Sequence, residues 1–199
     1  MYVILLAGLA GLALFLERLY VIVVVGKAGG AALSERVIGL VRAGRAEEAR
    51  EACGASHAAL PDVGHLLLSA RGGDEDSLQN VADAASLAVL PRLTRRLQYL
   101  PMLANVATLL GLFGTIYGLR EAFASVALAS AAERAERLAA GIAVALNATG
   151  FGLLVAIPLT VGHSYLASQA ERIIEQVDEF AVRLINALLD RADVRLGQR

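Results

Sequence analysis

The distribution of charged residues divides the chain into long apolar runs and short polar segments. Two runs contain no Asp, Glu, Lys or Arg: residues 97–119, which number 23, and residues 138–170, which number 33. A helix needs about 20 mainly apolar residues, at about 1.5 Å of rise each, to cross the hydrocarbon core of a bilayer. Both runs are therefore predicted to be transmembrane helices.

A third apolar stretch opens the sequence. Residues 1–16 carry no charge, and after Glu17 and Arg18 the apolar pattern continues to Gly26. The alternative is a cleaved signal peptide, but no basic residue precedes Arg18 and no clear A-x-A cleavage site follows. We therefore expect residues 1–26 to form an uncleaved first transmembrane helix.

The orientation follows from the distribution of Lys and Arg. Residues 27–96 contain nine of them and the tail, residues 171–199, contains five, whereas residues 120–137 contain three. Segments rich in Lys and Arg stay on the cytoplasmic side. The sequence therefore predicts a cytoplasmic helical region at 27–96, a short periplasmic loop at 120–137 and a cytoplasmic tail, with the N-terminus outside and the C-terminus in the cytoplasm.

The cytoplasmic segments show helical periodicity. A break at Gly44 predicts a short helical hairpin, and turns are expected at residues 60–62 and 71–74. The tail is predicted to continue the third transmembrane helix as an amphipathic helix. Its apolar face is expected to contain Ile173, Ile174, Val177, Phe180, Leu184, Ala187 and Leu188.

The segment before the second transmembrane helix also has a helical pattern. Either Asp74 or Ser77 is a suitable N-cap, and the helical pattern is expected to run to Arg96 and into the second transmembrane helix. Pro91 and Pro101 are the points where this helix is expected to kink.

Composition agrees with this class of protein. The chain is 57% hydrophobic and 19% charged, whereas a soluble domain carries about 25% charged residues. The net charge of −1 disfavours nucleic-acid binding, and a single cysteine excludes an intramolecular disulfide. The predicted fold is an all-α integral membrane protein, with three transmembrane helices and long cytoplasmic helical extensions.

Catalytic and metal-binding motifs are weak or absent. Residues 162–166 begin like a nucleophile elbow but lack its closing glycine and a preceding strand. Cys53, His57 and His65 have no convincing fourth metal ligand. Since paired carboxylates and a catalytic triad are also missing, we expect no enzymatic activity, no metal site and no cofactor.

Small and hydroxyl residues recur at steps of three and four along the second and third transmembrane runs, which places them on one face of each helix. These are Ala104, Thr108, Gly111, Thr115, Gly118 and Ala122 in the second run, and Gly141, Ala145, Thr149, Gly152, Ala156, Thr160 and His163 in the third. Small residues let membrane helices approach closely, so Gly111, Gly114, Gly118, Gly141 and Gly152 are predicted helix-packing positions. The spacing leaves two interpretations open, a packed helix–helix contact and a weakly polar wall along a pathway.

Neither run contains a carboxylate or a basic side chain, and a proton relay normally uses such groups. His163 lies too near the predicted cytoplasmic end to act as a sole relay. If protons cross here, another chain must supply the titratable group, most simply from its own membrane helix.

Three segments resemble the ExbB/TolQ/MotA proton-channel family. LANVATLLGLFGTIYGLREAF, residues 103–123, resembles the second span of that family, and GIAVALNATGFGLLVAIP, residues 141–158, resembles its third. MYVILLAGLAGLALFLERLYVI resembles its first span, with Glu17 and Arg18 as the usual acidic–basic pair. The three-span layout is similar to the ExbB and TolQ type.

The resemblance implies a non-enzymatic inner-membrane stator subunit. Family members form a homo-oligomeric ring, typically a pentamer, around single-span partners of the ExbD/TolR type, and proton (H+) flow through an Asp of the partner drives movement. By motif match, Thr115 and Thr149 would line the interior near that Asp. Thr108 and Thr160, which the spacing places on the same faces, are the further candidates for the ion-pathway lining. The alternatives are a passive helical membrane scaffold and a gliding or flagellar-type stator of the same family.

Two positions depart from the family pattern. Many relatives have a Glu five residues before the third-span threonine, where this chain has Val144, and many have a proline at the position of Thr108. The first departure removes an ionisable group near the outer end of the expected pathway.

Overall fold

A computed structural model describes residues 2–25, 30–55, 58–70 and 74–196. These residues form helices and contain no strand, which confirms the predicted all-α fold. The elements are α1 (Tyr2–Leu19), a π-helical segment (Tyr20–Val25), α2 (Ala31–Arg42), α3 (Ala46–Gly54), α4 (Ala59–Ser69), α5 (Glu75–Thr94), α6 (Tyr99–Ala127) and α7 (Arg134–Leu196).

Three segments are long and apolar enough to cross a membrane, as predicted. They lie within Tyr2–Val23, Glu75–Ala127 and Arg134–Arg191. Helix α6 continues beyond the charge-free run to Ala127, so the connection to α7 consists of residues 128–133. Helix α7, which contains the third membrane-spanning segment, has 63 residues and continues as a single helix into the tail.

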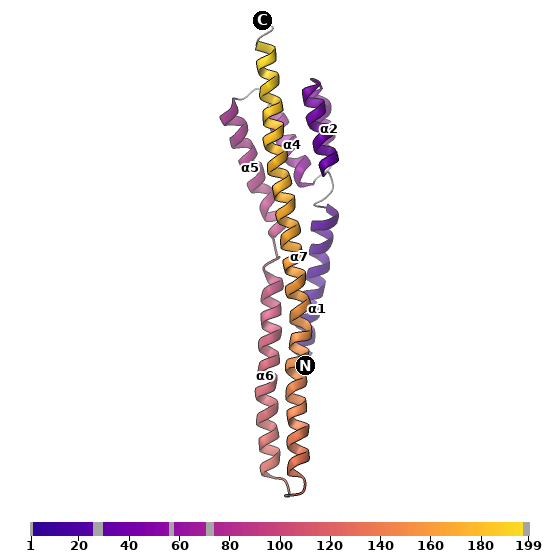
Figure 1. Ribbon diagram of the computed structural model, residues 1–199, viewed down its shortest axis with the longest axis vertical. Helices are drawn as coiled ribbons and strands as arrows, with labels where there is room; N and C mark the ends of the chain where they lie inside the picture. The colour runs from indigo at the N-terminus through magenta and orange to yellow at the C-terminus, as the bar shows by residue number, and fades with distance from the viewer. Residues whose placement is uncertain (1, 26–29, 56–57, 71–73, 197–199) are drawn as a thin grey trace. The chain divides into compact units, whose positions relative to one another are not determined.

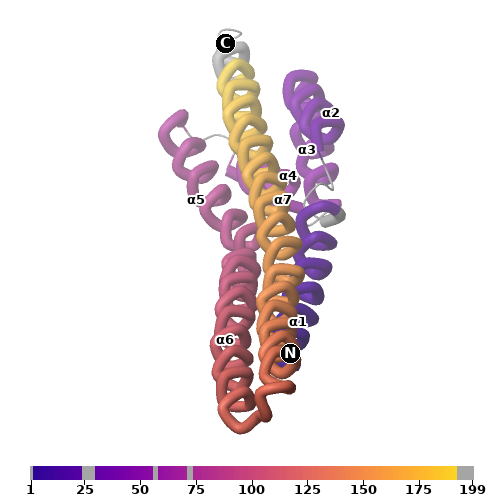
Figure 2. Tube along the Cα trace, turned by 60° about the horizontal axis from the view of Figure 1, so that its bottom comes forward, coloured from indigo at the N-terminus to yellow at the C-terminus, as the bar shows by residue number. Residues whose placement is uncertain are grey.

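The chain divides into two compact units. The first unit contains residues 1–18 and 96–165, and its helices are α1, α6 and the first part of α7. Within it, α6 and α7 run side by side along their length (Figures 1 and 2). Large apolar side chains, among them Leu109, Phe113 and Ile116, are more than half exposed, as expected for surfaces that face lipid or other membrane helices.

The second unit contains residues 19–95 and 166–199 and has its own apolar core. Val37 of α2, Leu67 of α4, Leu78 of α5 and Phe180 of α7 are almost completely buried there. The predicted apolar face of the tail is confirmed: Ile174 and Leu188 are half-buried, and the other members, Ile173, Val177, Phe180, Leu184 and Ala187, are buried.

The hairpin around Gly44 is also confirmed. Gly44 separates α2 from α3 and has a φ angle of +87°, a conformation that glycine adopts without steric cost. Arg191 of α7 donates to the carbonyl oxygen of Val41 at 3.1 Å and so fixes the end of α2. Asp74 is the N-cap of α5 and accepts a hydrogen bond from the Ser77 backbone N–H at 3.3 Å. Residues 71–73 of the predicted turn lie outside the described residues.

The turn predicted at Leu60–Asp62 is wrong, because these residues lie in the first turn of α4. Backbone N–H groups in the first turn of a helix have no acceptor within that helix. Pro61 therefore removes no hydrogen bond there, and its fixed φ angle suits the helical start.

The prediction of one helix that runs from Asp74 into the membrane, with kinks at Pro91 and Pro101, is also wrong. Helix α5 ends at Thr94, α6 begins at Tyr99, and Arg96 between them has a φ angle of +67°. Pro101 explains the break, because its ring clashes with the carbonyl of Leu97 when an α-helix passes through both residues. The Arg96 guanidinium contacts Glu17 of α1 at 2.8 Å, which offsets part of the cost of this backbone conformation. Pro91, in contrast, lies inside α5.

Candidate functional site

Glycines bring α6 and α7 into backbone contact. A Cβ atom added at Gly152 of α7 would lie 2.7 Å from the carbonyl oxygen of Ala107 and 3.0 Å from the Cα atom of Gly111, both on α6. A Cβ atom at Gly111 would lie 3.2 Å from the Cα atom of Gly152. Real Cβ atoms do not occupy positions closer than 3.0 Å to other heavy atoms, so Gly152 cannot acquire a side chain without separating the helices.

The same contact continues toward the 128–133 connection. A Cβ atom at Gly118 would lie 3.0 Å from the Cα atom of Ala145, and one at Gly141 would lie 2.9 Å from the Cα atom of Ala122. At Gly114 the nearest atom is the Cβ of Ala148, at 2.6 Å. We call this contact, which involves Gly111, Gly114, Gly118, Gly141 and Gly152, the glycine seam.

Thr115 and Thr149 meet in the glycine seam. The Oγ1 atoms of the two residues are within hydrogen-bonding distance of each other, and both residues are half-buried. Both hydroxyls also lie within hydrogen-bonding distance of one carbonyl oxygen, that of Gly111, at 3.1 Å from Thr115 of α6 and at 3.2 Å from Thr149 of α7. Since each hydroxyl has one proton, the pair donates in two of these three contacts at a time. The small residues of the seam make this interhelical bond possible, since it requires close backbones.

Thr108 and Thr160 have a different environment. Both are exposed on this chain, and each donates to the carbonyl oxygen four residues earlier in its own helix, at 3.1 Å from Thr108 to Ala104 and at 2.9 Å from Thr160 to Ala156. Such bonds are the usual way in which a threonine satisfies its hydroxyl inside a membrane helix. The structure therefore joins two of the four candidate threonines and leaves the other two on the surface of the unit.

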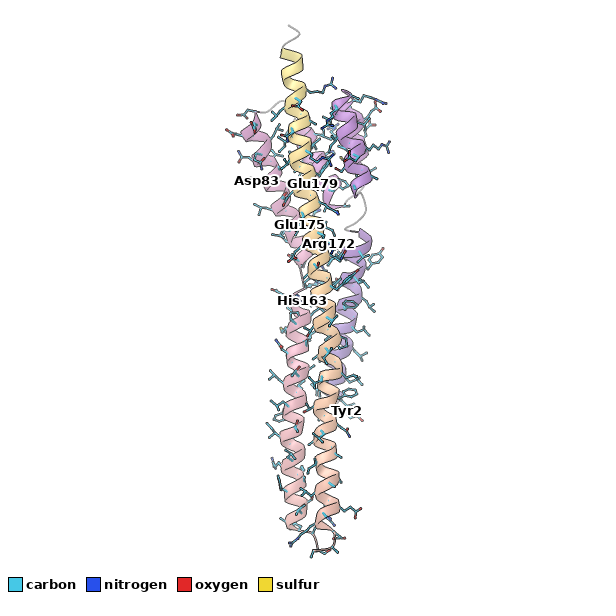
Figure 3. All side chains as sticks on the ribbon, in the orientation of Figure 1. Tyr2, Asp83, His163, Arg172, Glu175 and Glu179 are labelled. Atoms are coloured by element: carbon cyan, nitrogen blue, oxygen red, sulfur yellow. The ribbon has the colours of Figure 1, made fainter. Side chains whose placement is uncertain are left out.

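The Thr115–Thr149 pair can donate and accept hydrogen bonds but cannot exchange protons near neutral pH, because a hydroxyl side chain does not titrate there. Residues 97–119 and 138–170 contain no charged side chain. His163, labelled in Figure 3, is half-buried on α7, two residues before the first unit ends at Tyr165. These two runs therefore supply no carboxylate at the threonine pair.

The sequence analysis assigned no functional role to two features of the first unit. Asn147 lies on α7 two residues before Thr149 and is exposed, although it belongs to a charge-free run. An amide is costly in lipid, so its presence in that run was the available signal. Helix α1 also packs on α7 through glycines: a Cβ atom at Gly11 would lie 2.6 Å from Leu159, and one at Gly162 would lie 2.7 Å from Phe15.

The discarded motifs have clear structural positions. Residues 162–166 lie inside α7 and not on a strand-to-helix turn, so they do not form a nucleophile elbow. Cys53 is buried in α3, His65 is exposed on α4, and His57 lies outside the described residues. In the described part of the chain, no three His, Cys, Asp or Glu residues are grouped as metal ligands.

Comparison with known proteins relates the residues of this site to the same family that the sequence resembles. Residues 54–179 match the MotA/TolQ/ExbB proton channel family. The chain is 34% identical over 94 residues to biopolymer transport protein exbB1 of Vibrio cholerae, covering 47% of this chain and 41% of that protein. It is 34% identical over 114 residues to the Tol-Pal system protein TolQ of Pseudomonas aeruginosa, covering 55% and 49%, and 35% identical over 96 residues to TolQ of Haemophilus influenzae, covering 46% and 42%. The matches thus span less than half the length of these relatives.

Proposed function

Because the match covers more than half of its residues, the chain belongs to the MotA/TolQ/ExbB proton channel family, and we propose that it is the ring-forming stator subunit of an ion-driven inner-membrane motor. In this proposal, several copies surround a single-span partner of the ExbD/TolR type, with a pentamer as the expected ring. Proton flow through the complex would drive movement against an envelope partner. Residues 27–96 and the tail face the cytoplasm in this arrangement.

The Thr115–Thr149 pair is the observation that carries the proposal. It is a hydrogen-bonding site between the charge-free runs 97–119 and 138–170, which suits a carboxylate delivered by another chain. A threonine hydroxyl donates to a charged carboxylate and accepts from a protonated one. The pair can therefore bind both protonation states of a partner Asp without carrying the proton itself.

The surface of the first unit supports assembly. Asn147 and Thr160 are exposed on α7, where contact with lipid would leave at least the amide without hydrogen-bonding partners. A neighbouring subunit or partner helix would supply those partners. The large exposed apolar side chains of α6 are compatible with lipid and with protein neighbours.

The test is proton uptake by vesicles that contain the purified chain, with and without its single-span partner. We expect uptake only from the complex, and we expect it to disappear when the membrane Asp of the partner is replaced by Asn. A complex that forms but conducts no protons would support a passive helical scaffold instead. The envelope process that is energised, including a gliding or flagellar-type one, would be set by the periplasmic part of the partner.

A further inference from the structure

The second unit contains an apolar groove between α5 and α7, with a volume of about 480 Å³. Its walls include Leu87 and Leu90 of α5 and Ile174, Val182 and Ile185 of α7. Leu87 is 68% exposed and Val182 is 52% exposed. Helix α5 carries Glu75, Asp76, Asp83 and Arg92, so it does not lie in lipid, and exposed side chains of this size outside a membrane mark a binding surface.

The charged side chains that line this groove are acidic. Asp83 and Asp178 line it, and no Lys or Arg is among the described residues that do. Ser86 donates to Asp178 at 3.0 Å across the groove, which holds that carboxylate on the wall. Glu175 and Glu179 lie on the same stretch of α7 (Figure 3), together with Arg172, and Glu179 is paired with Arg183 at 3.6 Å. The acidic character of the groove therefore rests on Asp83 and Asp178. A helix that fits here should have small residues and basic side chains.

The outer face of α2 has these properties. Glu35 lies one turn before Gly39 on α2, and its charge is already paired with Arg183 of α7 at 2.6 Å. The inner face of α2 is fixed to the core by Val37. On the opposite side, a Cβ atom at Gly39 would meet nothing within 4 Å, and Ala32 and Ala43 are exposed. This face is therefore shallow, with room for a protruding leucine.

Two unpaired cations complete the match. Arg36 and Arg42 are exposed on either side of Gly39, and neither side chain has an ion-pair or hydrogen-bond partner in the part of the chain that the structure describes. The groove thus presents Leu87 together with two carboxylates, and α2 presents a glycine with an arginine three residues to each side. Paired charges across an interface fix its register and exclude wrong partners.

We propose that the α5–α7 groove of one subunit binds the outer face of α2 from a second copy of this chain. Leu87 then packs on Gly39, and Arg36 and Arg42 pair with Asp178 and Asp83. The two surfaces are different, so the contact is heterologous, and repetition of such a contact around an axis closes a ring. The inference rests on the proposed ring and assigns one of its subunit contacts.

The test is cross-linking between two differently tagged variants that are produced in the same cells. One carries Gly39→Cys and the other carries Leu87→Cys, and membranes are treated with a short bismaleimide. We expect a product that contains both tags from the mixture and none from either variant alone. Ala84→Cys is the matched control, because it is also exposed on α5 but does not line the groove; its mixture with Gly39→Cys should give no product.

Charge reversal provides a second measurement. Arg36→Asp with Arg42→Asp should reduce the mixed product severalfold, and adding Asp83→Arg with Asp178→Arg in the other variant should restore it. A Leu87→Cys product with itself, or with an unrelated protein, would overturn the assignment. Native mass spectrometry of the wild type distinguishes a failure of the groove contact from a failure of the proposed ring. An oligomer without the mixed cross-linked product refutes the groove contact, whereas a monomer refutes the ring.

Discussion

Thr149 of α7 donates a hydrogen bond to the carbonyl oxygen of Gly111 on α6, across 3.2 Å. The same glycine allows the contact, because its missing side chain leaves room for the Cα atoms of Thr149 and Gly152. Packing and hydroxyl chemistry are therefore joined at one position of the glycine seam. Variants that alter only one of the two are needed to distinguish a packed contact from an ion pathway.

Neighbouring glycines of α7 offer such a comparison. Gly152→Ala places a methyl group 2.7 Å from the carbonyl of Ala107, whereas a Cβ atom at Gly150 meets nothing within 4 Å. We expect Gly152→Ala to lower the free energy of unfolding by about 1–3 kcal/mol, the usual cost of overpacking. Gly150→Ala should leave it unchanged or raise it by up to about 1 kcal/mol, the helix-propensity difference between the residues. Thermal or denaturant unfolding in detergent, followed by circular dichroism, measures both. Equal effects of the two substitutions would contradict the close approach at Gly152.

The positions of the long helices along the chain could be predicted from the sequence, because they depend on the charge and hydrophobicity of individual residues. Charge-free runs and the 3.6-residue period locate α1, α6 and α7, and the same period gives the buried face that includes Val177 and Phe180. The break at Arg96 was missed because Pro101 was treated as a kink inside a continuing helix. Its actual effect is on the carbonyl four residues earlier, at Leu97.

The candidate site was only partly predictable for a similar reason. Periodicity placed four threonines on the faces that contain the small residues, but it could not distinguish Thr115 and Thr149 from Thr108 and Thr160. That distinction depends on where two helices cross, which the glycine contacts determine. The groove between α5 and α7 requires the packing of helices distant in sequence, and no local pattern indicates it.

Cys53 should be a slow nucleophile. Its side chain packs against Gly64 and is 1% exposed, and burial raises the pKa of the thiol from 9.0 to about 11. The thiolate is the reactive form, so at pH 8 ionisation alone should make the reaction with a maleimide about 100-fold slower than that of an unfolded chain. The rate should increase with pH until about pH 11. Fast labelling of the folded protein at pH 8 would contradict the buried position.

The same pKa shift predicts a loss of stability in alkaline solution. Below pH 9 the thiol is neutral in the folded and unfolded chains, so it adds no pH dependence. Between pH 9 and about pH 11 only the unfolded chain ionises, and the free energy of unfolding should fall by up to about 3 kcal/mol, two pKa units at about 1.4 kcal/mol each. Cys53→Ala should lack this part of the pH dependence, which denaturant titrations of both proteins at pH 8 and pH 10.5 would measure. An equal change in the free energy of unfolding of both proteins between pH 8 and pH 10.5 would contradict the prediction.

The low reactivity of Cys53 makes introduced cysteines useful for topology. Ser130 is exposed in the connection between α6 and α7, and Ser69 is exposed at the end of α4. The Lys and Arg distribution places the first position outside the cytoplasm and the second inside. A membrane-impermeant maleimide should therefore label Ser130→Cys in spheroplasts, where the periplasmic face is accessible, and Ser69→Cys only after lysis. Labelling of Ser69→Cys in intact spheroplasts would reverse the proposed orientation.

The hydroxyl pair makes the most direct prediction about ion flow. Valine has nearly the shape of threonine, so Thr115→Val and Thr149→Val preserve packing at Gly111 while they remove a donor. If the pair binds a partner carboxylate, the loss should destabilise its charged form by about 1–3 kcal/mol, which corresponds to roughly 5- to 150-fold slower proton turnover if that form limits the rate. Thr160→Val is the matched control, because that hydroxyl bonds only to the Ala156 carbonyl of its own helix. Flux must be measured in complexes whose ring and partner are verified by native mass spectrometry, and serine at positions 115 and 149 should restore it. Wild-type flux in both valine variants would mean that the threonines only pack the seam.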